Sequence, residues 1–219
     1  MSNVTSANSS ATFSAAQIAE RGALINGQPP RVLPEYSEAT IKAAQERTAR
    51  LRRASSGSDE PVAVADIPEM LLTLMCHPDL YDRVAGLSVQ LLGSGTMIPR
   101  DRELIVLRAT WLCQAPYAWG EHVRMAKREG ISSDVIERVV IGSTAAGWSD
   151  YERALLVAVE ELHDGAMISD STWAVLSGYL SSQQMFELIV LVGQFSMVAY
   201  FQNSFRFRLG DGNDGLQAR

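Results

Sequence analysis

The sequence predicts an all-α protein. Apolar residues recur at helical spacing from residue 67 onward, and prolines and serines stand where helices are expected to begin. No stretch shows the alternation that is typical of a half-buried strand. The 219 residues, 47% hydrophobic and 20% charged, are enough for one globular domain with a sizeable core.

The N-terminal third contains one expected helix. Residues 1–35 are polar and carry three prolines, which predicts a flexible arm or one that orders only against a neighbouring subunit. A helical domain is expected over residues 36–210, followed by a C-terminal tail at 211–219. Its first helix is predicted over residues 37–53, with Ser37 as the N-cap.

A proline or a capping side chain opens each later helix. Pro68, Pro78 and Pro99 suit first-turn positions, and Pro116 is expected to break the third of these helices. The expected helices cover residues 68–76, 78–93, 99–113, 117–129 and 133–141, then one starting at Ser149, one capped by Asp170, and a last one over 182–207.

The string Glu-Leu-Ile-Val-Leu occurs twice, at residues 103–107 and 187–191. Equivalent placement of the two copies predicts two related helical halves packed together. His122 follows the first copy at the spacing where Arg206 follows the second. An acid–imidazole pair is therefore expected only in the first half.

Several classes of function are disfavoured by composition. A formal net charge of -6 argues against nucleic-acid binding. The two cysteines and three histidines lack the spacing of a disulfide framework or metal site. The apolar run at 189–201 is interrupted by Gln194 and Ser196, so it is interpreted as a core helix rather than a membrane span. With no signal segment recognised, a cytoplasmic location is expected.

Glu103 and His122 are the candidate catalytic residues. Helix 99–113 places Glu103 and Thr110 on one mostly apolar face, where a carboxylate is rare unless paired. Glu103 is then either a cavity-facing acid or an ordinary first-turn glutamate favoured by the helix dipole. His122 lies on the apolar stripe of the next helix. It is either a core histidine bonded to a carbonyl or a proton carrier.

Residues from about 77 to 207 resemble the carboxymuconolactone decarboxylase / alkylhydroperoxidase D-like (AhpD-like) superfamily. The matching motifs are His77-Pro78, Arg102-Glu103-Leu104-Ile105-Val106-Leu107-Arg108, Tyr117-x-Trp119-x-x-His122-x-x-x-Ala126-x-x-x-Gly130, Gly147-Trp148-Ser149 and Glu160-Glu161-Leu162-His163-Asp164. The resemblance implies an all-helical bundle that assembles into homo-trimers or homo-hexamers, with sites near subunit contacts.

The peroxidase branch of that superfamily carries Cys-x-x-Cys-x-x-x-His. Here the two cysteine positions hold Ala115 and Ala118, and Tyr117 stands at the place of a second relay histidine. Cys113 is two residues from the first position, about 200° around a helix. Because disulfide cycling needs two suitably placed thiols, that activity is not expected here.

The decarboxylase branch works without those cysteines. The resemblance implies a cofactor-independent lyase or isomerase, with no metal, acting on a small anionic lactone or carbonyl compound. It gives His122 the role of general acid and Glu103 that of its orienting or recharging partner. The expected substrate-binding residues are Tyr117, Trp119, Thr110 and Arg108. Which of Arg102, Arg108 and Arg124 binds an anion stays open, and Arg108 has a structural alternative in pairing with Asp101.

Two other functions and one geometric difficulty accompany this hypothesis. The chain is alternatively an atypical peroxidase using Cys113 or Cys76, or a non-catalytic oligomeric binding protein. In a simple hairpin broken at Pro116, Glu103 and His122 miss each other by about 10 Å along the axis. They meet only if the first helix ends early, the helices cross steeply, or the pair forms between subunits.

Overall fold

The computed structural model describes residues 13–56 and 58–219, and within them all regular structure is helical, which confirms the all-α prediction. The elements are α1 (Ala15–Ile25), α2 (Glu38–Ser56), a 3-10 turn η1 (Val64–Asp66), α3 (Glu69–Leu74), α4 (Pro78–Gly93), α5 (Pro99–Leu112), α6 (Pro116–Arg128), α7 (Ser133–Ile141), α8 (Asp150–Gly165), α9 (Asp170–Leu176), α10 (Ser182–Phe205) and η2 (Gly215–Gln217).

Most predicted helix starts are confirmed, because they depend on short-range capping. Ser149 and Ser181 form capping boxes at the starts of α8 and α10, and Ser132 caps α7. The cap of α9 is Ser169 rather than Asp170. α10 ends at Phe205, two residues earlier than expected, because Arg206 adopts a left-handed conformation.

The N-terminal segment differs from its prediction. Instead of an unstructured arm, residues 15–25 form α1, which begins in a capping box at Ser14. The helix is attached to its own chain: Arg21 donates to the Gln114 carbonyl, and Asn26 donates to the Phe207 carbonyl. Long-range contacts supply this order, and periodicity alone did not reveal it. The part of the predicted arm at 1–12 lies outside the described residues.

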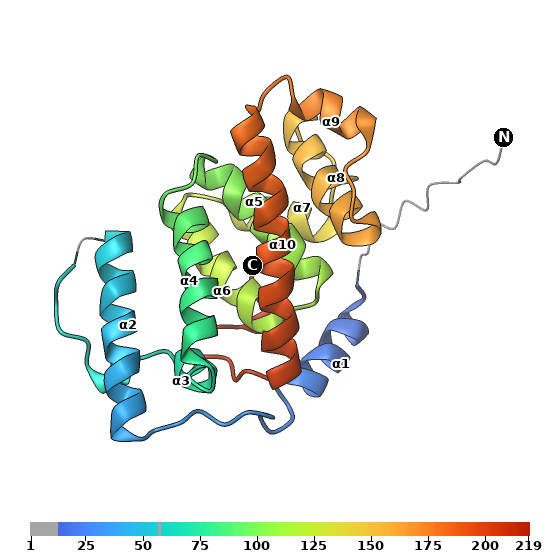
Figure 1. The fold of residues 1–219 in the computed structure, drawn as a ribbon. Coiled ribbons are helices and arrows are strands. Elements are labelled where there is room, and N and C mark those ends of the chain that lie inside the picture. The colour runs from blue at the N-terminus through green and yellow to red at the C-terminus, as the bar shows by residue number, and fades with distance from the viewer. Residues whose placement is uncertain (1–12, 57) are drawn as a thin grey trace.

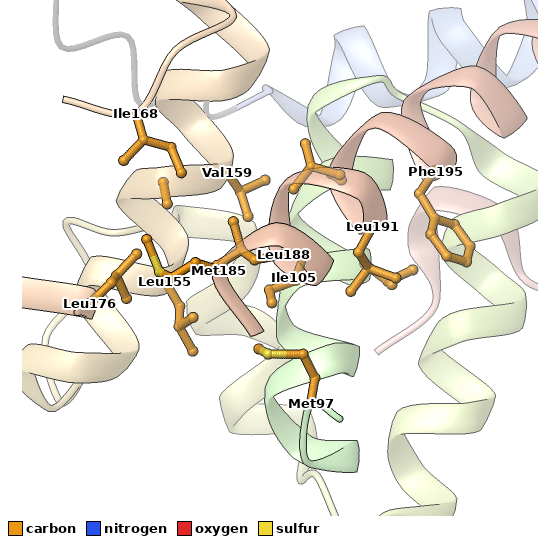
Figure 2. Packing of buried hydrophobic residues seen from close by; sticks show 14 of the residues in the cluster. Met97, Ile105, Leu155, Val159, Ile168, Leu176, Met185, Leu188, Leu191 and Phe195 are labelled. Atoms are coloured by element: carbon orange, nitrogen blue, oxygen red, sulfur yellow. The ribbon is translucent and has the colours of Figure 1, made fainter. Parts of the chain in front are cut away.

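α5 and α10 form the centre of the molecule, and α10 crosses its middle in Figure 1. The two copies of Glu-Leu-Ile-Val-Leu lie on these two packed helices. Ile105 of α5, Leu155 of α8 and Leu188 of α10 belong to one buried cluster, which Figure 2 shows. A second cluster joins α5 to α6 and α7 through Trp111 and Trp119. The helix that will carry the candidate acid is therefore held on both sides.

The two copies lead into different local structures. α10 continues without interruption for 24 residues. Although it is long and apolar enough to cross a membrane by composition, Leu188 and Leu191 are fully buried against the rest of the protein. It is the core helix expected from its polar interruptions. α5, in contrast, stops at Leu112 and the chain turns back into α6.

The turn between α5 and α6 brings the two helices into register. Gln114 has a φ of 44°, its N–H donates to the Trp111 carbonyl, and the Ala115 N–H donates to the Thr110 carbonyl. These are the two bonds of a Schellman ending. Because α5 ends at Leu112 and α6 begins at Pro116, the expected axial mismatch falls to three residues, about 4.5 Å. The early ending resolves the geometric difficulty within one chain.

The C-terminal residues are part of the core rather than a loose tail. Leu216 and Ala218 are buried in the cluster around Trp119, whose indole N–H donates to the Ala218 carbonyl. Asn213 packs so closely on α6 that a Cβ at Gly120 would overlap its side chain. The last residues therefore fix the outer side of α6 while α5 and α10 contact its inner side.

Candidate active site

The structure brings Glu103 and His122 together. Glu103 Oε2 lies 2.9 Å from His122 Nδ1, and both residues belong to the same chain. Glu103 is 0% exposed and His122 is 6% exposed. A fully buried carboxylate requires a partner, and the imidazole supplies one. The pair therefore meets the geometric requirement for proton transfer between an acid and a base.

A second polar side chain contacts the same carboxylate. Arg102 Nε lies 3.3 Å from Glu103 Oε1, and Arg102 Nη1 donates over 3.0 Å to the Leu92 carbonyl. Leu92 lies in the last turn of α4, where carbonyls lack helical partners and the helix dipole is negative. Arg102 thus links the end of α4 to the buried pair.

The imidazole is oriented by one hydrogen bond and one ring contact. Phe195 of α10 meets the His122 ring edge-to-face, with ring centroids 4.7 Å apart. With Glu103 ionised, Nδ1–H donates to the carboxylate, and the neutral ring carries its lone pair on Nε2. Among the described residues Nε2 has no hydrogen-bond partner. Nε2 is therefore the ring nitrogen that the described residues leave unpaired.

Two of the expected substrate-binding residues have their polar groups engaged in the core. Thr110 is 0% exposed, and its hydroxyl bonds to the carbonyls of Val106 and Leu107 within α5. Trp119 is also 0% exposed, and its ring packs on Trp111 at a centroid distance of 4.8 Å. In this arrangement both residues hold α5 and α6 in place rather than present a group to a ligand.

Arg108 is a buried brace. It does not pair with Asp101, whose carboxylate accepts instead from the Tyr151 hydroxyl. Arg108 Nε bonds to Glu160 Oε1 at 2.9 Å, and Nη1 donates to the carbonyls of Val139 and Val140 at the end of α7. Nη2 lies 2.8 Å from the same Glu160 oxygen. The guanidinium joins α5, α7 and α8, and it is 0% exposed.

Tyr117 lies on a different face of α6 from His122. Five residues of α-helix separate their directions by about 140°. The Tyr117 ring packs edge-on against Phe207, 5.9 Å away. Burial, with a smaller contribution from the charge of Glu121, raises the pKa of the Tyr117 hydroxyl to about 12. The hydroxyl therefore stays protonated at neutral pH, as a donor near the α6–Phe207 contact.

The positions of the two redox cysteines in the peroxidase branch are packed with alanine. Ala115 and Ala118 are buried against Ala199 of α10, with Cys113 beside them. Burial raises the pKa of the Cys113 thiol above its ordinary value, which disfavours the thiolate. Cys76 is exposed, and both cysteines are free. In residues 13–56 and 58–219, no group of three or more His, Cys, Asp or Glu residues is placed to hold a metal ion.

The sequence alone assigns no role to Arg102 or Phe195 at this site. Arg102 is one of three candidate anion partners, and its position next to Glu103 is the available signal. Residues adjacent in a helix normally point apart, so this contact depends on the Arg102 side chain bending back toward Leu92. Phe195 had no sequence signal, since its meeting with His122 results from the packing of α10 on α6.

The all-helical fold of this chain is also found in AhpD-like structures. Solved structures with this fold include an AhpD-core, peroxidase-related protein from Ralstonia eutropha JMP134, with a TM-score of 0.65, 16% identity, and coverage of 86% of this chain and 99% of that one. The debrominase Bmp8, solved with 2,3,4-tribromopyrrole, has a TM-score of 0.67 and 15% identity, with 85% and 95% coverage. At these identities the likeness establishes the fold alone.

A sequence comparison is more specific. Residues 78–161, which contain both Glu103 and His122, match the Carboxymuconolactone decarboxylase family. The resemblance predicted from the motifs is confirmed for this segment, and the all-helical fold agrees with it. Among solved structures, a protein of unknown function from Agrobacterium tumefaciens shares the fold over 63% of this chain and 94% of its own, with 22% identity and a TM-score of 0.58. No curated protein matches the chain by sequence.

Proposed function

We propose that the protein is a cofactor-independent lyase of the carboxymuconolactone decarboxylase type. The observation that carries the proposal is the buried Glu103–His122 pair, 2.9 Å apart, in a segment that matches the decarboxylase family. The substrate class is a small anionic lactone or related carbonyl compound. Loss of carbon dioxide from such a carboxylate leaves a carbanion that is stabilised by conjugation with the lactone carbonyl.

The pair supplies the proton that completes this reaction. The C–C bond to the carboxylate breaks and its electron pair stays on the substrate carbon as carbon dioxide leaves. That carbon then takes the proton from Nε2 of the His122 imidazolium, and water returns a proton to Nε2. Glu103 holds Nδ1–H throughout, so the ring keeps its orientation while Nε2 exchanges the proton. The net reaction consumes one proton and releases one carbon dioxide.

The local chemistry does not favour an atypical peroxidase. Peroxide reduction by thiol chemistry requires an accessible thiolate, and Cys113 is partly buried with a raised thiol pKa. Ala115 and Ala118 provide no resolving thiol. For this reason we prefer the decarboxylase hypothesis to a thiol peroxidase activity inferred from the peroxidase-related neighbours.

We also propose that the protein works as a homo-oligomer, a trimer or a hexamer, in the cytoplasm. Large apolar side chains stand exposed along one side of α10, among them Phe186 at 70% and Tyr200 at 63%. Contiguous apolar surface of this kind is typical of a contact between subunits. α10 also carries Phe195 against His122, so a partner seated there would lie near the site. Two free cysteines suit a reducing compartment.

The test compares His122→Ala with His163→Ala, since His163 is exposed and outside the site. Carboxymuconolactone is supplied, and its consumption and carbon dioxide release are followed. His122→Ala is expected to lower kcat by about 10²- to 10⁴-fold, as for loss of a general acid. His163→Ala and thiol-alkylated protein should keep native rates. Turnover surviving in His122→Ala, or lost on alkylation, would reject the mechanism; no turnover by native protein would reject the substrate class.

A further inference from the structure

Arg102, Glu103 and His122 form a single charge system, and its balance changes when any member is removed. The Glu103 carboxylate is shared, with Oε1 facing Arg102 Nε and Oε2 facing His122 Nδ1. With a neutral imidazole the charges of Arg102 and Glu103 cancel. Without Arg102 the same state would leave a negative charge in a fully buried position, which is strongly unfavourable.

That arrangement decides which nitrogen of His122 exchanges a proton. Arg102 Nε faces Glu103 Oε1, so Oε2 stays turned toward His122 Nδ1. With Nδ1–H engaged by the carboxylate, Nε2 is left to exchange the proton, and a fixed exchanging nitrogen is what general acid catalysis requires.

The other groups around His122 leave Arg102 as the cation that sets the charge of the pair. α10 presents the Phe195 ring, and the single charged residue of that helix, Glu187, accepts from Thr96 and Met97 instead. On α6 itself, Glu121 and Arg124 pair with each other on the exposed side. η2 contains no charged residue, and the nearby Arg219 pairs with Glu137.

Arg102 is held in position by the end of α4. Its Nη1 donates to the Leu92 carbonyl, and its side chain is only 13% exposed, so solvent screens its charge weakly. The loop that follows α4 is fixed in turn by Glu187, which accepts from the Thr96 and Met97 N–H groups. The glutamates of the two repeated strings thus act on the same region, Glu103 on the imidazole and Glu187 on the loop that places Arg102.

We infer that Arg102 is a positioning residue for the proposed proton transfer. It holds Glu103 Oε1 so that Oε2 faces His122 Nδ1, which fixes a hydrogen on Nδ1 and leaves Nε2 as the exchanging nitrogen. It acts through Glu103 rather than by touching the substrate. This role rests on the proposed function for its purpose, but the state of the imidazole can be measured with no substrate present.

The experiment uses nitrogen-15 NMR of the histidine rings in the full-length protein, with His122 assigned by its disappearance in His122→Ala. In native protein the neutral ring should show a protonated Nδ1 and an unprotonated Nε2. In Arg102→Met the carboxylate loses its partner on Oε1, so the neutral ring should show both tautomers instead of one. Arg102→Lys keeps a charged donor and should stay closer to the native tautomer.

Two controls make the result decisive. Arg100→Met removes an equivalent charge on the same helix, where Arg100 pairs with Glu152, and should leave the His122 tautomer unchanged. Arg102→Leu also removes every donor, so it replaces Arg102→Met if that variant does not fold. The native tautomer, retained in a folded variant that lacks the donors of Arg102, overturns the inference. Failure of the proposed function appears separately, as His122→Ala retaining turnover.

Discussion

Replacing Arg108 by Met tests whether this arginine braces the fold or binds substrate. The side chain is 0% exposed and joins three helices through Glu160 and the carbonyls of Val139 and Val140. Removing one partner of a buried ion pair costs about 3–5 kcal/mol, because the remaining groups lose their counterpart. Glu160 keeps two bonds from Ser143, so the lower part of this range is expected.

The loss is measured by urea unfolding followed by circular dichroism, at one protein concentration, since association also affects stability. Thermal unfolding gives a second measure. For a chain of this size, a loss of 1 kcal/mol lowers Tm by about 2–4 °C, so a fall of about 6–12 °C is expected for a loss of about 3 kcal/mol. Arg108→Lys keeps the charge but not the planar fork and should lose less. In Arg108→Met/Glu160→Met, the combined loss should be smaller than the sum of the two single losses.

A contrary outcome is easily recognised. If Arg108→Met unfolds with native stability and raises KM for the lactone instead, then Arg108 contacts substrate and the described bonds contribute little. Near-additive losses in the double variant would also contradict the coupling between Arg108 and Glu160.

Two further predictions concern the cysteines and the exposed face of α10. At neutral pH iodoacetamide should label exposed Cys76 before Cys113, and labelling of Cys113 should accelerate only as the pH rises, because burial raises the pKa of its thiol. Peptide mass spectrometry measures both sites. Faster labelling of Cys113 at neutral pH would revive the peroxidase hypothesis. In sedimentation equilibrium, Phe186→Ser/Tyr200→Ser should reduce the native mass toward the 23.9 kDa of one chain. A native protein already at that mass would refute the oligomer.

Helix starts were predictable because their causes are local. Ser149 and Ser181 bond to N–H groups three residues away, and proline suits the first turn wherever it occurs. Glu103 and His122 could be nominated in the same way, as polar residues on apolar helical faces. The motifs around them were sufficient to predict the resemblance to the family that residues 78–161 match, and the class of chemistry stays a prediction.

Contacts between distant residues decided the rest. α1 is held by Gln114 and Phe207, far along the chain, and no sequence pattern indicates those contacts. Trp119, which resembled a pocket residue in sequence, is enclosed because the C-terminal residues fold back over it.

The candidate site depends in part on residue type and in part on tertiary packing. That Glu103 and His122 could exchange a proton follows from the chemistry of their side chains alone. That they meet depends on α5 ending at Leu112, and that Arg102 rather than Arg108 stands beside them depends on where α4, α7 and α8 place their carbonyl and carboxylate groups. Capping and periodicity act over a few residues, whereas burial and charge pairing depend on the whole packed chain.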